Sequence, residues 1–315
     1  MTLISSAASA GGVQVQPLSA HIGALIHGVS LQSPLSAEAV GQIRQALLRW
    51  KVVFFRDQAL SHAQQIAFAR QFGEPTVGHP VFGHVDGHPE LYSIAKHRTA
   101  NRFDGPGELR PWSGWHTDVT AAVNPPAASI LRGVDIPPYG GDTQWTNLVT
   151  AYQKLSEPLR RFVDGLRGIH RFSAPPGATA TEAYRQLVQN HQLVSEHPLV
   201  RVHPETGERV LFVSPGFLKS LVGFSPRESR HLLELLWEHI LRPEFTVRFK
   251  WEPGSVAFWD NRATAHLAPS DIFDLDFDRQ LYRVTLVGDV PVGVDGRPSS
   301  ALEGDPLLAV HAAAH

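Results

Sequence analysis

Two side chains that could hold a metal ion lie two residues apart near the middle of the chain. His116 and Asp118 fall in the run 115–120, which is otherwise made of Trp, Val and Thr, residues that favour strands. In a strand, residues i and i+2 point to the same face, so the imidazole and the carboxylate would converge while Thr117 turns away. They would supply two of the three ligands of a 2-His-1-carboxylate site on non-haem Fe(II). The alternative is an ordinary pair of polar side chains on a strand, so the hypothesis requires a second histidine.

That second histidine would have to come from a distant part of the chain. His266 ends the segment 258–266, and only the fold could bring it beside Asp118. The chain has no Cys, which excludes disulfides, Cys-bound zinc and iron–sulfur clusters. Any metal must therefore be held by His and carboxylate groups. Most of the 17 His residues are expected to be ordinary surface groups, including His311 and His315.

Composition and charge argue against several classes of function. The 315 residues carry a formal net charge of -2, and no basic run could supply phosphate contacts, so no nucleic-acid partner is expected. No apolar run approaches the roughly 18 residues of a membrane span, and residues 1–12 lack the pattern of a signal peptide. We therefore expect a soluble, cytoplasmic protein with no membrane partner.

Apolar periodicity and capping residues predict both helices and strands. Helices are expected to begin near residues 36, 61, 147, 156 and 225, where Ser or Asn can cap them, and the second is expected to stop at Gly73. The long segment 76–114 reads mostly as loop, and long loops in compact domains are usually functional. Residues 91–95 form one apolar piece within that loop. Strands are expected at 13–18, 52–55, 115–120, 127–133, 142–145, 200–203, 209–213, 246–251, 255–259 and 280–288.

The order of these elements predicts an α+β protein with a mainly β core. Strands precede and follow a helical region without βαβ alternation or a glycine-rich phosphate loop, which favours a jelly roll with flanking helices. We expect one domain over residues 13–292, with a helical insert at about 171–192 acting as a lid. Residues 1–12 and 293–315 are expected to be peripheral tails.

The motifs together resemble the Fe(II)- and 2-oxoglutarate-dependent taurine, alkylsulfonate and alkyl sulfate dioxygenases. The resemblance covers roughly residues 13–292 and is carried by four pieces of sequence. The fold of that family is a double-stranded β-helix, the cupin-like jelly roll, so the resemblance implies the same fold as the order of elements. The four pieces are residues 115–120, residues 140–143, residues 259–262 with His266, and the pair Arg279 and Arg283.

The resemblance also implies a role for each matching residue. His116, Asp118 and His266 would be the iron ligands. Thr143 would bond a carboxylate of 2-oxoglutarate and Arg279 would bind its distal carboxylate, a task suited to a planar, permanently charged guanidinium. With O2 as second co-substrate, 2-oxoglutarate would be decarboxylated to succinate and CO2 while the carbon next to sulfur or ester oxygen is hydroxylated. The product would collapse to an aldehyde plus sulfite or sulfate. Residues 259–262 would hold the turn before His266.

The spacing of the two arginines predicts two separate anion sites. On a regular strand, Arg279 and Arg283 would face the same side with their Cα atoms roughly 13 Å apart, too far for one small carboxylate. With Arg279 assigned to 2-oxoglutarate, the resemblance implies that Arg283, together with His79, binds the sulfonate or sulfate of a small anionic substrate.

The presumed substrate pocket departs from the taurine enzyme pattern at three positions. Phe82 stands where a Tyr is expected, Trp112 where an Asn is expected, and Ala121 where a Phe is usual. The pocket should therefore be roomier and more apolar, with Val119 and Phe217 as walls. A larger hydrophobic sulfonate or alkyl sulfate is predicted to be preferred over taurine, because the taurine ammonium would be buried without a partner.

Three other interpretations remain open at this stage. A related oxygenase could act on a non-sulfur organic acid such as an aryloxyalkanoate. A zinc hydrolase could use the same two His and one Asp with an activated water, although Thr143 and Arg279 would then need another role. A non-catalytic jelly-roll binding protein would have no use for an intact ligand set. The resemblance also implies a homo-oligomer, a dimer or a tetramer.

Overall fold

The computed structural model describes residues 12–97, 102, 110–174 and 179–312, and its largest sheet has seven strands. Every neighbouring pair in this sheet is antiparallel except β2 and β3. In spatial order the strands are β1 (Gln14–Pro17), β2 (Ala24–His27), β3 (Val52–Phe55), β13 (Val256–Asp260), β5 (Ala128–Asp135), β15 (Gln280–Leu286) and β4 (Leu91–Ala95).

Three smaller sheets complete the β structure. Trp145, on the central strand of the first of these sheets, packs against Phe54 and Trp259 of the large sheet. Its ring centroid lies 5.3 and 5.6 Å from theirs. These rings form a core between two sheets, which is the jelly-roll arrangement expected from the sequence. The first sheet is β12 (Thr246–Phe249), β6 (Thr143–Asn147) and β14 (Thr264–Leu267). The second is β10 (Arg209–Leu211), β9 (Val200–Val202) and β16 (Val292–Gly293), and the third is β11 (Leu218–Leu221), β7 (Arg167–Arg171), β8 (Val194–Pro198) and β17 (Ser300–Glu303).

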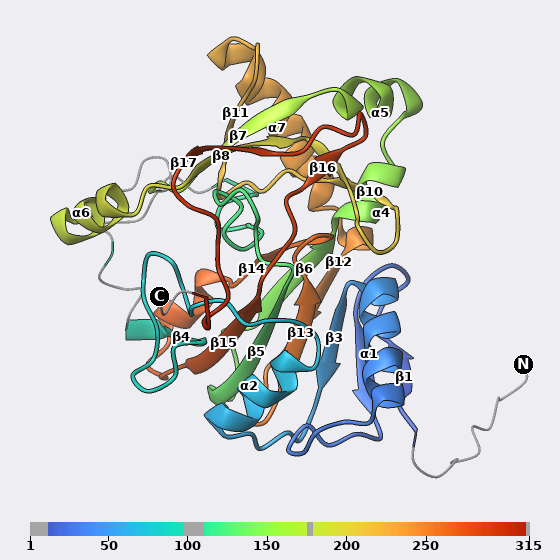
Figure 1. Ribbon diagram of the computed structural model, residues 1–315, viewed down its shortest axis with the longest axis vertical. Coiled ribbons are helices and arrows are strands. Elements are labelled where there is room, and N and C mark those ends of the chain that lie inside the picture. Colours follow the sequence, from blue (N-terminus) through green and yellow to red (C-terminus); the bar gives the residue numbers. More distant parts are fainter. Residues whose placement is uncertain (1–11, 98–101, 103–109, 175–178, 313–315) are drawn as a thin grey trace, which may run out of the picture.

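Helices begin where the sequence supplies caps. Ser36 caps α1 (Ala37–Trp50), and reciprocal capping boxes begin α2 (His62–Arg70) and α7 (Pro226–Ile240). The apolar faces of α1 and α2 cover the outer face of the large sheet, while α7 lies at the far end of the molecule beside β7 and β11 (Figure 1). The remaining helices are α4 (Leu148–Gln153), α5 (Glu157–Asp164), α6 (Glu182–Asn190) and the short η1 (Pro243–Phe245) and η2 (Ser270–Asp274).

Several local expectations were wrong. Helix α2 ends at Arg70 and not at Gly73, because the amides of Gln71 and Phe72 already make the tighter bonds of a terminal turn. The run 115–120 is not a strand, as described below. Short strands β2, β4, β7, β8, β11, β14, β16 and β17 were not foreseen, since two to five residues carry little periodicity.

The segment after Val292 runs over the outside of the molecule but is paired to it. Strand β17 adds to β8, and Val292 and Gly293 pair with β9. Further along, Ala309 bridges to Thr76, and the Asn124 side chain both donates to and accepts from the backbone of Leu307 at 2.9 and 2.8 Å. The expected insert at 171–192 contains α6, although part of it, 175–178, lies outside the described residues. Among the described helices, none is long and apolar enough to span a membrane.

Candidate active site

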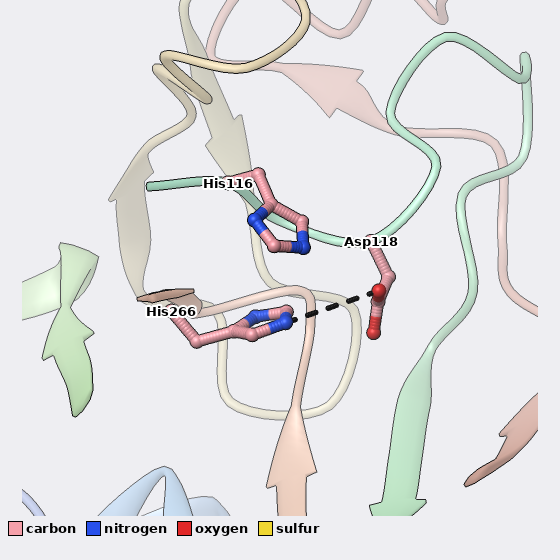
Figure 2. Close-up of side chains that lie close together, drawn as sticks. All are labelled: His116, Asp118 and His266. Carbon is pink, nitrogen blue, oxygen red and sulfur yellow. Dashed lines mark ion pairs between the residues drawn. The ribbon is translucent and has the colours of Figure 1, made fainter. Parts of the chain in front are cut away.

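His116, Asp118 and His266 meet between the large sheet and the β12–β6–β14 sheet. One potential ligand atom from each lies within 4.8 Å of the others, and Figure 2 shows both imidazoles turned toward the carboxylate. His266 comes from β14, and its backbone exchanges two hydrogen bonds with that of His116, at 2.9 and 2.7 Å. The distant histidine is therefore brought into place by a single β-bridge.

The convergence of His116 and Asp118 does not arise from a strand. After the bridge at His116 the chain turns through residues 118–120, and Val119 adopts a left-handed φ of 45°. Thr117 points away from the cluster as expected, and its hydroxyl donates to the Thr264 carbonyl at 2.7 Å. A left-handed β-branched residue is strained, so the surrounding contacts must hold this turn.

The protonation states suit a divalent metal. Nδ1 of His116 donates to the Gly114 carbonyl at 2.9 Å, which leaves Nε2 free to act as a ligand. Burial lowers the pKa of His116, and burial together with the neighbouring His116 ring lowers the pKa of His266 to about 3, so both imidazoles are neutral. Burial alone would raise the pKa of Asp118, but Arg283 and the two imidazoles hold it well below its usual range. Two neutral imidazoles and one carboxylate form the donor set of non-haem Fe(II) sites, and all three fit that ion.

Thr143 and Arg279, which were expected to bind 2-oxoglutarate, lie together at the start of β6. Oγ1 of Thr143 accepts from Trp251 Nε1 at 2.9 Å and from Arg279 Nη2 at 3.4 Å, so the hydroxyl proton remains available for an anion. Arg279 is buried, and within the described part of the chain no carboxylate lies at ion-pairing distance from it. Burial lowers the pKa of Arg279 to about 10, which still leaves it charged at neutral pH. The site thus contains a buried cation that no carboxylate contacts directly, although the charges of Asp271 and Asp142 oppose the effect of burial on its pKa.

Gly141 allows Arg279 to reach this position. Its φ is 65°, and a Cβ atom built there would lie 2.9 Å from Cδ and 3.1 Å from Nε of Arg279. Any other residue would collide with the guanidinium stem as well as strain the turn. The expectation of a regular strand between the two arginines was wrong, because the register shifts between Gln280 and Leu281. Both guanidinia are nevertheless buried, and they contact different groups.

Arg283 and His79 lie close to Asp118. Arg283 Nη1 forms a very short ion pair with Asp118 Oδ1, and its guanidinium lies 5.4 Å from the Tyr92 ring centroid. The backbone amides of Val81 and Phe82 both donate to Nδ1 of His79 at 3.0 and 3.1 Å. The neutral ring must then carry its proton on Nε2, because burial and the nearby Arg283 charge lower the His79 pKa strongly.

Most of the predicted pocket residues come together, but one does not. Val119, Ala121, Phe82 and Phe217 share one apolar cluster with residues of α6, and the Phe217 ring lies 6.4 Å from His116. Trp112 instead packs against Trp237 of α7, with centroids 5.6 Å apart. The turn at 111–114 carries its ring toward the helix at the far end of the molecule.

Several residues at the site were missed from the sequence. Ser129 donates to Asp118 Oδ2 at 2.6 Å, and Trp251 holds Thr143. Tyr92 and Phe172 pack against His79, and Arg102 lies 3.8 Å above the Phe82 ring. Their signals are single residues in strands and loops, without spacing that would mark them. The periodicity of β5 could have indicated that Ser129 faces inward with Leu131.

The segment 259–262 has two separate functions in the structure. Asp260 accepts from Arg262 and from His203 in a fully buried network, which fixes the turn before His266 as expected. Asn261 instead points toward the metal cluster, where its side-chain amide donates to Ser129 at 2.8 Å.

A jelly roll with a buried two-histidine, one-carboxylate cluster and an uncompensated inward arginine is the arrangement of the jelly-roll metal-dependent oxygenases. The chain belongs to the family described as taurine catabolism dioxygenase TauD, TfdA, whose model matches residues 14–285. It is accordingly a dioxygenase, an oxidoreductase, and its alpha-ketoglutarate-dependent relatives imply 2-oxoglutarate, O2 and iron.

Three relatives illustrate this membership. The chain is 43% identical over 304 residues to the alpha-ketoglutarate-dependent sulfate ester dioxygenase of Pseudomonas putida, covering 94% of this chain and 96% of that protein. It is 39% identical over 292 residues to an alkylsulfatase of Acinetobacter baylyi, covering 90% and 88%. Its fold matches the crystal structure of a taurine dioxygenase from Burkholderia xenovorans with a TM-score of 0.83 at 70% identity, covering 94% and 96%.

Proposed function

We propose that this chain is an Fe(II)- and 2-oxoglutarate-dependent dioxygenase that hydroxylates a sulfate ester or organosulfonate. The attacked carbon is the one next to the ester oxygen or the sulfur, and the products are an aldehyde plus sulfate or sulfite, together with succinate and CO2. The observation that carries the proposal is the buried His–Asp–His cluster beside the unpaired Arg279. A zinc hydrolase would need the cluster but would have no use for that arginine.

In this proposal each group of the site has a separate task. His116, Asp118 and His266 hold Fe(II), which, when bound with 2-oxoglutarate and O2, supplies the oxidant for the C–H bond. Arg279 and the free Thr143 hydroxyl proton bind the distal carboxylate of 2-oxoglutarate, which turns its reactive end toward the metal.

The substrate anion is held on the opposite side of the cluster. The Nε2–H of His79 and the remaining donors of Arg283 bind the sulfate or sulfonate beside the metal rather than on it. Fixing the anion restricts which carbon reaches the reacting centre. The aromatic rings around Phe82 and Phe172 exclude water from the same space.

Within this class we propose that a larger alkyl sulfate or alkylsulfonate is preferred over taurine. The names of the relatives do not decide between these substrates. One is named a sulfate ester dioxygenase, one an alkylsulfatase and one a taurine dioxygenase. The side chains of Val119, Ala121 and Phe217 offer no partner to the taurine ammonium, and an unpaired buried charge costs several kcal/mol. Each buried CH2 of a longer chain instead contributes about 0.8 kcal/mol. Trp112 is not part of this argument, because it packs elsewhere.

A substrate screen tests both levels of the proposal. Succinate formation is measured with taurine, hexyl and octyl sulfate, the matching sulfonates and an aryloxyacetate, using Asp118→Ala as the inactive control. We expect the highest kcat/KM with the alkyl sulfates. A clear preference for taurine would refute the pocket argument, and a preference for the aryloxy acid would refute the sulfur chemistry. If no compound stimulated 2-oxoglutarate consumption, the dioxygenase assignment itself would fail.

A further inference from the structure

A chain of three hydrogen bonds ends on the carboxylate of Asp118. Trp259 Nε1 donates to Asn261 Oδ1 at 2.8 Å, Asn261 Nδ2 donates to Ser129 Oγ at 2.8 Å, and Ser129 Oγ donates to Asp118 Oδ2 at 2.6 Å. The donors and acceptors can be ordered in only one way. An indole N–H only donates and an ionised carboxylate only accepts, so the amide orientation of Asn261 and the hydroxyl proton of Ser129 are both fixed.

The four side chains of this hydrogen-bond chain are buried from water. Ser129 is 0% exposed, Trp259 and Asn261 are 1% exposed, and Asp118 is 2% exposed, so water does not compete for these bonds. Ser129 and Trp259 are directly paired residues on the neighbouring central strands β5 and β13. The backbone N–H of Asn261 also donates to the Ala127 carbonyl at 3.0 Å, which ties the turn to the residue before β5. The chain of hydrogen bonds therefore positions Asp118 from the central strands of the sheet.

The two oxygens of Asp118 consequently face different surroundings. Oδ2 is engaged by Ser129, whereas Oδ1 faces the imidazole of His266, 3.9 Å from its Nε2, and the guanidinium of Arg283. Building on the proposed function, we propose that Ser129 is a positioning residue that keeps Asp118 a one-oxygen ligand of the metal. Asn261 supports it by orienting the serine hydroxyl.

A one-oxygen carboxylate matters because of the number of groups that must share the metal. Two imidazoles and one carboxylate oxygen would leave room on the metal for 2-oxoglutarate and O2, whereas a carboxylate that binds through both oxygens would take up part of that room. Without the Ser129 hydroxyl, Asp118 would no longer be held in the orientation that binds the metal. We therefore expect weaker metal binding and slower consumption of 2-oxoglutarate.

The test measures metal affinity directly, without turnover. Mn(II) binding to the full chain is followed by the loss of its free EPR signal, in the absence of 2-oxoglutarate and substrate. We expect Ser129→Ala to weaken binding about 10-fold, the lower end of the effect typical for groups that orient metal ligands. Ser129→Thr keeps the hydroxyl and is expected to bind Mn(II) nearly as the natural chain does. Asn261→Ala is expected to have an intermediate effect that disappears in the Ser129→Ala background.

Ser195→Ala is the matched control. Ser195 is 1% exposed and donates to the Ala121 carbonyl at 2.8 Å, so its loss removes a similar buried hydrogen bond near the same turn without touching Asp118. We expect native Mn(II) affinity there, and a native rate of 2-oxoglutarate consumption. The inference is overturned if Ser129→Ala keeps native Mn(II) affinity, or if Ser195→Ala weakens Mn(II) binding equally. Failure of the natural chain to bind Mn(II) or Fe(II) would instead refute the proposed function.

Discussion

At the scale of single residues, the site is organised by which buried charges have partners. Asp118 is paired with Arg283 and accepts from Ser129, whereas the guanidinium of Arg279 donates only to the hydroxyl of Thr143 among the described hydrogen bonds. A buried charge without a counter-ion is costly, so its presence indicates a ligand that arrives with the opposite charge. The two guanidinia are therefore not equivalent.

Their difference leads to a prediction for steady-state kinetics. Arg279→Ala is expected to raise the KM for 2-oxoglutarate by about 10- to 100-fold, because a hydrogen bond to a charged group contributes roughly 1.5–3 kcal/mol. Arg283→Ala is expected to raise the KM for the sulfate or sulfonate by a similar factor, with a smaller change for 2-oxoglutarate. Equal effects of both substitutions on both KM values would contradict the division of labour.

At the scale of elements, the turn that carries Asp118 is held by buried histidines of the neighbouring sheet. Nε2 of His197 on β8 donates to the Thr120 carbonyl at 2.8 Å, and its Nδ1 lies 2.6 Å from the Ser299 hydroxyl oxygen. His170 on β7 lies 4.9 Å away, ring to ring, and bonds the Thr120 hydroxyl. Two strands that lie outside the large sheet thus stabilise the strained turn at Val119.

This arrangement predicts that stability falls with acidification. Burial lowers the pKa of His197 to about 3, with Arg201 and Arg167 adding to the effect and the bonded carbonyls opposing it, while His170 is shifted in the same direction. Below its unfolded pKa of about 6.5 the unfolded chain therefore binds a proton that the folded chain does not. His197 alone costs about 1.4 kcal/mol per pH unit between pH ~6.5 and ~3, and His170 adds to the loss in the same direction.

The measurement is the free energy of unfolding in urea between pH 7 and 5 for the natural chain and for His197→Gln. Glutamine can still donate to the Thr120 carbonyl but does not titrate, so the variant should lose stability less steeply as pH falls. Identical slopes for the two proteins would show that His197 is not responsible. His231, an exposed histidine on α7, provides the control substitution His231→Gln, which should leave the slope unchanged.

At the scale of the whole molecule, the C-terminal segment joins the loops on both sides of the site. Asn124, six residues after Asp118, exchanges two hydrogen bonds with Leu307, and the Val310 amide donates to the Pro75 carbonyl at 3.0 Å. The first contact holds the chain six residues beyond Asp118, and the second holds the loop that leads to His79. The segment lies beyond residues 14–285 matched by the family model.

Removal of residues 305–315 is therefore expected to affect substrate binding more than metal binding. The KM for the sulfate or sulfonate should rise several-fold, because the loop bearing His79 loses its anchor, while Mn(II) affinity stays within about twofold. Asn124→Ala is the milder variant and should cost about 2 kcal/mol of stability from two lost hydrogen bonds. A truncated protein with a native KM would show that the segment does not anchor the loop bearing His79. Leu302→Ala, on the exposed side of β17, is the control.

Features specified by local chemistry could be predicted from the sequence alone. Ser36, Ser61 and Ser225 cap helices as expected, and the ligand types His116, Asp118 and His266 follow from the motifs and the resemblance that they carry. Only the tertiary structure brought His266 to His116, through a bridge between segments 150 residues apart. It also replaced the expected strand at Asp118 with a turn, and it placed Trp112 on α7. These outcomes depend on contacts between distant segments, whose free energies exceed local backbone preferences and leave no periodic trace in the chain.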